Sequence, residues 1–555
     1  MHITNIKAQN FRLIKSVNLE LSKNKQDLSL LIGKNNSGKT SFIVLLEKFL
    51  SSAKPNFGFD DFPIGLRSKI LGIDEKTDTH ELAISLLLDI HYNEDDSLGN
   101  IADFILDLDP AIHNVKILFE CTIKQKSFLN DLKQIEDRKN EYIQKHISNF
   151  LETSIYAVSD ESDINVKSKR HKLVKKEWKS VDFLINLQVI HAKRNVASSE
   201  STHGAKKVLS TLTTEYFNKE NKLSHDDQNG LNKSIIAMDV ELDKHYKIYF
   251  ERFLKTSKDF LNIQDLNVVS DLQSKGILEN HSKIIYGDVK SQLPEHLNGL
   301  GYMNILFLLL QIEIKKSHFS ETKKDVNLLF IEEPEAHTHP QMQYVFIEKI
   351  KKLLLEIPHL QTMISTHSSH IVNKCDFKEI RYFLKLDDGG IEIKNFYSDL
   401  AKKYKDEQEQ FKFLQQYLTL NSSELFFAEK IIFIEGTAEK LLLPLFIKKL
   451  DDKNADDSAY NPLSSQNISI LEVGANARVF RHFLDFLNIK TLIITDIDTT
   501  KLEPTDKKDR SGAVIEKPKA CPVVVGTHTS NCVFWPIPIT DSGFSRSPIL
   551  EHADH

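Results

Sequence analysis

Apolar and polar residues alternate over the first twenty positions and then give way to a continuous apolar run. The stretch "ITNIKAQNFRLIKSVNLELS" contains two alternating segments around a turn, and "LSLLI" is a short apolar run ahead of a glycine-bearing loop. A helical pattern starts near Thr40. The opening of the chain therefore predicts three strands, a loop and a helix.

The pattern changes between roughly Lys124 and Leu293, where charged residues are dense. In "SIIAMDVELDKHYKIYFERFLKTSKDFL" apolar residues recur every three or four positions, which is typical of a helix. We expect a mainly helical insertion over residues 125–289, with a role in dimerisation or as a lid. It divides a first domain into residues 1–124 and 290–420.

Short apolar runs return after the insertion and continue to the end of the chain. Strands are expected at "VNLLFIEEPEA" and "QTMISTHSSH", with the helix "HPQMQYVFIEKIKKLLLEI" between them. From residue 421 onward, "IIFIEGTAEKLLLPLF", "SILEVGA" and "TLIITDIDTT" alternate strands with helical stretches. This alternation predicts an α/β fold with a parallel sheet in a last domain over 421–555.

Composition narrows the class of protein. A chain of 555 residues with 41% hydrophobic and 27% charged residues is long enough for two or three domains. The net charge of -6 argues against a basic coat over the whole surface, although a local basic face remains open. The apolar run Ile305–Leu310 is far shorter than the roughly 20 residues of a membrane span. Four cysteines without CxxC spacing suit the cytoplasm, where we expect the protein to reside.

The loop after the third strand carries the pattern GxxxxGK[ST]. Backbone N–H groups of such a loop surround phosphate oxygens, and the helix that follows adds a favourable dipole. Lys39 is expected to reach the terminal phosphates of ATP, and Thr40 to hold Mg²⁺. The nucleotide-binding residues predicted here are Gly33, Asn35, Asn36, Ser37, Gly38, Lys39, Thr40 and Ser41.

Two glutamates and a histidine end the next two expected strands. Glu332 is expected to bind Mg²⁺ beside the nucleotide, and Glu333 to orient the attacking water. His367, at the end of "MISTH", is placed to sense the terminal phosphate. Without the phosphate loop, two solvated glutamates and a structural histidine would be an equally good interpretation.

These motifs, in this order, resemble the ABC-type ATPases of the SMC and RecF class. The matching segments are "FRLIKSVNLEL", "GKNNSGKTS", "EEPEAHTHP" and "STHSSH", within roughly 1–125 and 290–395. The resemblance implies ATP held between two heads, with the second head donating a signature loop. "HLNGLGYMNIL", with Gly301, holds that place here and departs from the usual LSGG pattern.

Four carboxylates in the last domain follow two apolar strands. Glu435 comes directly after "KIIFI", Glu439 lies one helical turn later, and Asp496 and Asp498 follow "TLIIT". Because the carboxyl ends of parallel strands meet at one edge of a sheet, we expect these side chains to lie close together. Carboxylates are the ligands that Mg²⁺ and Mn²⁺ prefer, and such ions activate phosphodiesters. Surface acids of an unrelated α/β domain are the alternative.

The carboxylate pattern resembles the Toprim module over roughly 425–535. Behind an SMC-like ATPase, it is similar to the OLD (overcoming lysogenization defect) family of nucleases, which includes the Gabija nuclease subunit and retron-associated effectors. The resemblance implies an ATP-regulated, metal-dependent endonuclease that nicks or cuts DNA in anti-phage defence. Its catalytic residues would be Glu333, His367, Glu435, Asp496 and Asp498, with metal ligands at Thr40, Glu332, Glu435, Glu439, Asp496 and Asp498.

The resemblance also implies partners: a homodimer or higher homo-oligomer, DNA, and a helicase or a retron reverse transcriptase with its msDNA. After "THTSN" the chain departs from the family and stops where further helices are expected, so a shortened chain and a natural variant are both open. A non-cutting, ATP-driven DNA clamp or sensor, or a scaffold with a degenerate Toprim domain, is the alternative function.

A basic cluster precedes the segment "DFLINLQVIHAKR". It comprises seven cations over residues 167–179, among them Arg170. Such a cluster can contact the phosphates of a duplex without reading its sequence. A solvated charged face is the more common role of such a run, so both interpretations stay open.

Overall fold

The computed structural model describes residues 1–192 and 300–496, apart from short gaps at 22–26, 52–54, 108, 110, 136, 160–163, 165–166, 323 and 422. Between 193 and 299 it describes only scattered residues, and after 498 it describes three strands. The insertion helix predicted in "SIIAMDVELDKHYKIYFERFLKTSKDFL" therefore lies largely outside the described residues, as do Asp498 and the end of the chain.

The N-terminal part of the chain forms an antiparallel sheet in the order β2-β1-β4-β5-β6-β7. Alternate residues of β1 face the core, which is why the predicted alternation appears as a strand. The strands are β1 (His2–Phe11), β2 (Ile14–Glu20), β4 (Ile84–His91), β5 (Asn114–Ile123), β6 (Leu151–Val158) and β7 (Val174–Lys176).

A second sheet, in the order β14-β13-β3-β12-β11-β8, carries the nucleotide motifs. It is parallel except for β14 at its edge. All seven residues of β11 are buried, as expected of a parallel strand covered on both faces. The strands are β3 (Asp27–Gly33), β8 (Ile185–Ile190), β11 (Val326–Glu332), β12 (Leu360–Ser365), β13 (Ile380–Lys385) and β14 (Ile391–Asn395).

The predicted boundary of the helical insertion at residue 125 is wrong. β6 pairs with β5 in the first sheet, and β8 pairs in parallel with β11 in the second. Residues 151–158 and 185–190 thus belong to the ATPase body. The charges that suggested helix line exposed positions next to these strands, and tertiary pairing overrides the local pattern.

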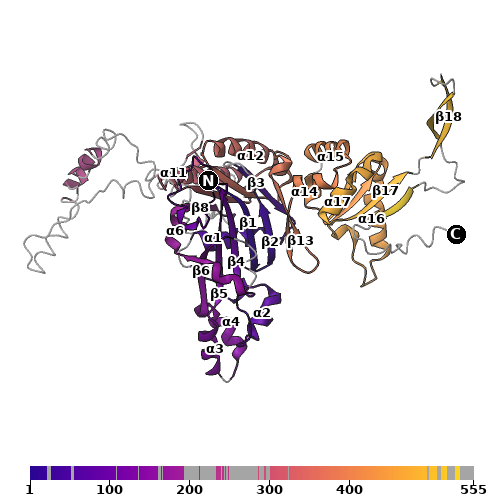
Figure 1. Cartoon of the computed structure of the whole chain (residues 1–555). Helices are drawn as coiled ribbons and strands as arrows, with labels where there is room; N and C mark the ends of the chain where they lie inside the picture. The colour runs from indigo at the N-terminus through magenta and orange to yellow at the C-terminus, as the bar shows by residue number, and fades with distance from the viewer. Residues whose placement is uncertain are drawn as a thin grey trace, which may run out of the picture.

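Helices cover both sheets (Figure 1). α1 follows the phosphate loop, and the predicted helix after the acidic strand is α12. The helices of this body are α1 (Lys39–Leu50), α2 (Ile64–Leu71), α3 (Gln125–Lys133), α4 (Lys139–His146), α6 (Trp178–Leu184), α11 (Leu300–Thr322), α12 (Pro340–Leu355) and α13 (Ser369–Val372). None of the helices that the structure describes combines the length and the apolar character needed to cross a bilayer.

The last domain is built on a sheet in the order β16-β15-β17-β20, in which β16, β15 and β17 run parallel. Its strands are β15 (Lys430–Ile434), β16 (Ile468–Glu472), β17 (Lys490–Asp496) and β20 (Cys532–Ile537). β18 (Thr499–Lys508) and β19 (Val514–Cys521) form a separate pair. The helices that follow β14 are α14 (Phe396–Lys403), α15 (Gln408–Asn421), α16 (Thr437–Lys453) and α17 (Arg481–Leu487).

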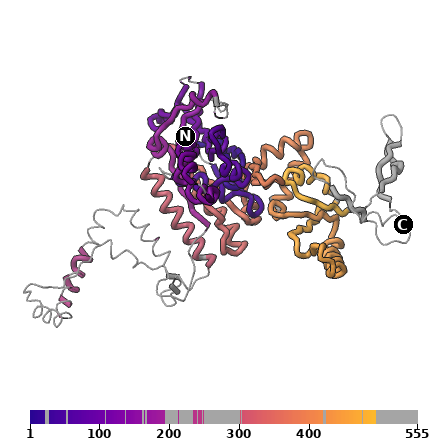
Figure 2. Tube along the Cα trace, turned by 90° about the horizontal axis from the view of Figure 1, so that it is seen from below, coloured from indigo at the N-terminus to yellow at the C-terminus, as the bar shows by residue number. Residues whose placement is uncertain are grey.

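The last domain lies beside the ATPase body and shares a hydrophobic core with it (Figure 2). Phe396 of α14 is fully buried at this junction, and its ring contacts Phe377 on one side and Phe426, Phe483 and Phe486 on the other. Because one continuous core spans both domains, the Toprim-type sheet is fixed to the ATPase rather than tethered to it.

Candidate functional site

The phosphate loop connects β3 to α1 in a conformation that needs glycine at two positions. Gly33 and Gly38 have φ angles of +153° and +87°. A Cβ at Gly33 would lie 2.4 Å from the carbonyl oxygen of Phe383, and one at Gly38 would lie 2.1 Å from Ile391. The glycines therefore permit both the turn and the close packing of neighbouring chain.

Lys39, the first residue of α1, is folded into the loop. Its Nζ donates to the carbonyl oxygens of Gly33 at 2.9 Å and Lys34 at 3.2 Å, and the side chain is buried. Burial lowers the pKa of Lys39 to about 8, although the charges of Glu333 and Glu335 act in the opposite direction. The ammonium is thus held among oxygens at the centre of the loop, where phosphate oxygens can replace the carbonyl partners.

The remaining loop positions suit a nucleotide. Asn35, Asn36 and Thr40 are exposed, whereas Ser37 is buried against Lys39. Thr40 and Ser41 lie in the first turn of α1, where free backbone N–H groups favour an anion. This arrangement fits a nucleotide phosphate tail.

Glu332, the last residue of β11, is buried and held by the neighbouring strand. His191, directly after β8, places Nδ1 at 3.2 Å from Oε2 of Glu332, and the backbone N–H of Ala192 donates to the same oxygen at 3.2 Å. The other ring nitrogen of His191 lies 3.2 Å from Oε1 of Glu47 in α1. Sequence reasoning missed His191, since nothing in its local pattern distinguishes it from other histidines.

Glu333 and His367 approach each other at the ends of β11 and β12. Oε1 of Glu333 lies 3.7 Å from Nε2 of His367, and Glu333 has a φ of +39°, a strained conformation for this residue. Burial, helped by the charge of Lys39, lowers the pKa of His367 to about 4. His367 is therefore neutral near pH 7, and its contact with Glu333 is not an ion pair.

Glu335 is a further acid that the sequence analysis did not single out. The backbone N–H of His367 donates to its Oε1 at 2.6 Å. The side chain is half-buried, and its partial desolvation raises its pKa. Glu335 thus fixes the strand end that carries His367, and it contributes to the field at Lys39.

The Toprim-type sheet brings the ends of β15 and β17 to one edge. β15 and β17 pair in the register Phe433 to Ile493. Glu435 directly follows the last residue of β15, and Asp496 is the last residue of β17. Glu439, in the first turn of α16, accepts a hydrogen bond from the N–H of Gly436 at 3.0 Å.

The carboxyl ends of β15 and β17 lie at one edge of the sheet, as the predicted carboxylate site requires. Among the residues that it describes, the structure does not show a complete set of metal ligands there. Asp498 lies outside the described residues. Within the part of the chain that the structure describes, no group of three or more metal-ligating side chains converges. The metal ligands remain a prediction.

Part of the basic cluster has a structural role. Arg170 donates to Oε2 of the buried Glu120 at 2.5 Å, and also to the carbonyl oxygen of Ile164. Arg170 is therefore occupied within the protein. Lys169, Lys172 and Lys175 are exposed beside it and keep the cluster available as a surface feature.

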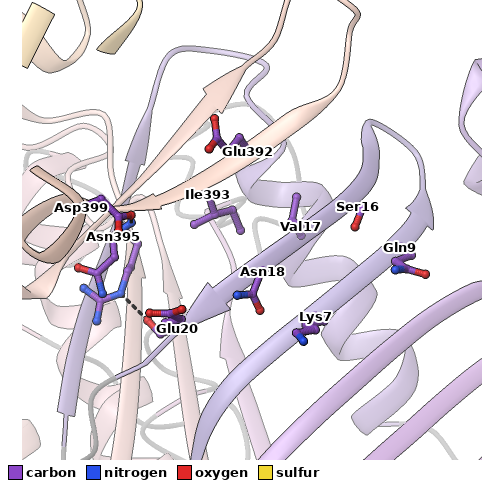
Figure 3. A pocket seen from close by; sticks show the side chains of 11 residues that line it. Lys7, Gln9, Ser16, Val17, Asn18, Glu20, Glu392, Ile393, Asn395 and Asp399 are labelled. Atoms are coloured by element: carbon purple, nitrogen blue, oxygen red, sulfur yellow. Dashed lines mark hydrogen bonds between the residues drawn. The ribbon is translucent and has the colours of Figure 1, made fainter. Parts of the chain in front are cut away.

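A polar pocket of about 550 Å³ lies away from these sites, between β2 and β14 (Figure 3). Glu20, Asn395 and Asp399 gather at one end of it, where the buried Arg381 donates to the carbonyl oxygen of Glu20 at 2.7 Å. Arg381 also donates to the carbonyl oxygen of Lys378 at 2.6 Å. The bond to Glu20 joins the two sheets of the ATPase body, because Glu20 ends β2 and Arg381 lies in β13.

Two families of known domains match the chain. Residues 1–372 match the AAA ATPase domain family, which is well over half of the chain. The chain belongs to the AAA ATPase family. In this AAA ATPase, residues 426–498 also match the Toprim domain of overcoming lysogenization defect protein-like proteins. The predicted α/β architecture, an ATPase domain followed by a Toprim domain, is confirmed, and so is the resemblance to OLD nucleases.

Curated relatives agree with this assignment. The AAA ATPase is 26% identical to Endonuclease GajA of Bacillus cereus (strain HuB5-5), over 92% of this chain and 78% of the relative. It is 24% identical to Old nuclease of Escherichia phage P2, over 92% of this chain and 79% of the relative. The Smc head domain of Pyrococcus furiosus is 13% identical, with a TM-score of 0.33 over 74% of this chain and 99% of that structure.

Proposed function

We propose that this AAA ATPase is an ATP-regulated, metal-dependent DNA endonuclease that nicks or cuts DNA in defence against phage or other foreign DNA. The observation that carries the proposal is the parallel pairing of β15 and β17, whose carboxyl ends share one edge of the sheet, with Glu435 directly after β15 and Asp496 the last residue of β17. The names of the relatives, an endonuclease and a nuclease, support the same activity.

In the ATPase site, Lys39 would exchange its carbonyl partners for the terminal phosphates of ATP. Thr40 and Glu332 would hold Mg²⁺, which neutralises phosphate charge when it is bound. Glu333 would accept a hydrogen bond from the attacking water. His367, neutral at pH 7, would donate a hydrogen bond to the terminal phosphate without adding charge.

In the Toprim site, Glu435, Glu439, Asp496 and Asp498 would hold Mg²⁺ or Mn²⁺. Such ions activate water and stabilise charge on a phosphodiester. Glu439 already accepts a hydrogen bond from the backbone at Gly436, which fixes its carboxylate at the start of α16. Glu435 precedes the helix on the strand side, so the two glutamates flank the same turn.

The working form proposed is a cytoplasmic homodimer or higher homo-oligomer that acts on DNA. A helicase, or a retron reverse transcriptase with its msDNA, is the partner proposed from the family resemblance. Exposed lysines beside Arg170 give a surface for phosphate contacts.

The decisive experiment incubates the full chain with supercoiled plasmid and Mg²⁺ or Mn²⁺, with and without ATP. We expect metal-dependent nicking or linearisation that Asp496→Ala removes and Asp452→Ala leaves intact. Asp452 is an exposed carboxylate of α16 and serves as the matched control. ATP hydrolysis is expected to persist in Asp496→Ala.

Absence of cleavage in the wild-type chain under every metal and nucleotide condition would reject the nuclease. DNA binding without cleavage would then support the alternative of a clamp or sensor. Comparison of reactions with and without ATP gives the sign of the regulation, and phage plating on cells expressing wild type or Asp496→Ala tests the defence role.

A further inference from the structure

A cavity of about 770 Å³ lies between the ATPase body and the Toprim domain. On the ATPase side it is lined by Lys34 and Asn35, at the start of the phosphate loop, and by Lys385, at the end of β13. In parallel α/β sheets, ligands bind at the carboxyl ends of the strands, and this wall of the cavity is such an edge. Its volume is within the range of small-molecule sites.

The Toprim wall of the cavity is formed at the amino ends of the parallel strands of the Toprim sheet. Lys430, Asn467 and Lys490 line it, and each lies at or directly before the first residue of β15, β16 or β17. The carboxylates predicted to bind metal follow the other ends of β15 and β17. The cavity is thus separate from the predicted nuclease site and belongs to the junction between the domains.

The charged groups around the cavity are mostly cations. Lys34, Lys385, Lys430 and Lys490 face two acids, Glu429 and Asp387. Burial lowers the pKa of Lys34, while the charge of Glu429 acts in the opposite direction. A partly buried lysine in a cavity with excess positive charge is stabilised by an anion.

Neutral groups complete the lining. The amides of Asn35, Asn467 and Asn488 can each donate to oxygen atoms of a ligand. His367, directly after the end of β12, lines the cavity together with Phe427, and the centroids of their rings lie 6.2 Å apart. Lysines and amides on two facing walls suit a group with several oxygens and more than one negative charge.

We propose that this cavity is a phosphate-binding site that joins the Toprim domain to the ATPase body. The phosphate has two conceivable sources: the tail of a nucleotide held by the neighbouring loop, or a separate phosphate-bearing small molecule. The recognition chemistry is the same for both. Asn35 and His367 of the proposed nucleotide site line the cavity, whereas Lys39, Thr40, Glu332 and Glu333 do not. The cavity therefore adjoins the proposed magnesium centre of the ATPase without including it.

The test uses inorganic tripolyphosphate as the probe and isothermal titration calorimetry of the full chain without DNA. The test variant is Lys385→Glu/Lys490→Glu, since both lysines are exposed and their replacement spares the core. The control is Lys448→Glu/Lys449→Glu, which changes the net charge by the same amount on exposed positions of α16. Each pair is also combined with Lys39→Ala, and unfolding midpoints show that each variant is folded.

Two outcomes support the site and separate the sources. If tripolyphosphate still binds to Lys39→Ala, and Lys385→Glu/Lys490→Glu then weakens binding at least about tenfold, a separate molecule occupies the cavity. The second outcome is that Lys39→Ala alone removes tripolyphosphate binding, while Lys385→Glu/Lys490→Glu in the presence of Lys39 weakens it by about tenfold. In that case the cavity contacts the phosphate tail of the nucleotide that the loop binds.

One outcome overturns the proposal. If Lys385→Glu/Lys490→Glu binds the probe as tightly as the control pair in both backgrounds, the cavity holds no phosphate. Because the titration contains no DNA, this result does not depend on whether the protein is a nuclease.

Discussion

His191 lies between two carboxylates, with Nδ1 3.2 Å from Glu332 and Nε2 3.2 Å from Glu47. Through this ring the helix that begins in the phosphate loop is connected to the acidic strand. The contact fixes the carboxylate proposed to hold Mg²⁺ without using an atom of the nucleotide. His191 is therefore a positioning residue for Glu332.

Replacing His191 with alanine is expected to raise the Mg²⁺ concentration needed for half-maximal ATP hydrolysis by about 10–100-fold. A change of this size is usual when the partner of a metal ligand is removed. His191→Gln keeps a donor near Glu332 and is expected to recover part of the loss. The measurement is ATPase rate against Mg²⁺ concentration, with the exposed His171→Ala as control. An unchanged magnesium midpoint in His191→Ala would reject the positioning role.

Lys39→Ala is expected to abolish ATP binding, because the loop loses its buried cation. Equilibrium binding of a fluorescent ATP analogue measures this, with the exposed Lys69→Ala as control. Retained binding with near wild-type affinity would show that the nucleotide lies elsewhere.

ATP affinity is also expected to depend on pH. The pKa of Lys39 is about 8, so the free protein loses this charge as the pH rises through that value. Because phosphate prefers the protonated lysine, affinity is expected to fall between about pH 8 and 10. Lys39→Arg keeps its charge over this range and is expected to lack this dependence, and a wild-type affinity that stays constant from about pH 8 to 10 would contradict the assignment.

His367 is expected to reduce stability in mild acid. Its pKa in the folded chain is about 4, below the ordinary value of 6.5, so the unfolded chain binds more protons between these values. Stability contributed at this position therefore rises as the pH increases from about 4 to 6.5. Urea unfolding at pH 5 and pH 7 is expected to show a larger acid loss for wild type than for His367→Gln. Equal losses would indicate an ordinary histidine.

Phe396→Ala is expected to lower the free energy of unfolding by about 3–5 kcal/mol, since a fully buried aromatic ring is removed from the domain junction. Because the ring contacts residues of both domains, we also expect unfolding to separate into two transitions. Denaturation followed by calorimetry measures both effects, with the exposed Phe413→Ala as control. A loss below 1 kcal/mol would argue that the junction is loosely packed.

The phosphate loop could be predicted from sequence because its geometry is local. Gly33 and Gly38 permit the turn, and the residues on either side already show a buried strand and a helix. The acidic strand was predictable for a similar reason, since five of its seven buried residues are apolar, four of them in the uninterrupted run 328–331.

The partner of Glu332 could not be predicted in this way. β8 joins β11 across about 140 positions of sequence, and only that pairing brings His191 to the carboxylate. The same pairing places β8 in the ATPase body instead of the insertion, and β6 is placed there by its pairing with β5 in the other sheet. The cavity between the domains also depends on a packing arrangement that no local pattern records.

The Toprim strands separate the cavity at one of their ends from the predicted metal site at the other. β17 has seven residues, which at about 3.3 Å per residue gives roughly 20 Å between its ends. This length exceeds the screening distance of about 8–10 Å at physiological salt. Where solvent separates the two sites, the charge of a nucleotide at the ATPase edge therefore has little direct effect on the predicted metal site. Any effect of the nucleotide on that site would have to pass through the shared core that packs the Toprim sheet against the ATPase body.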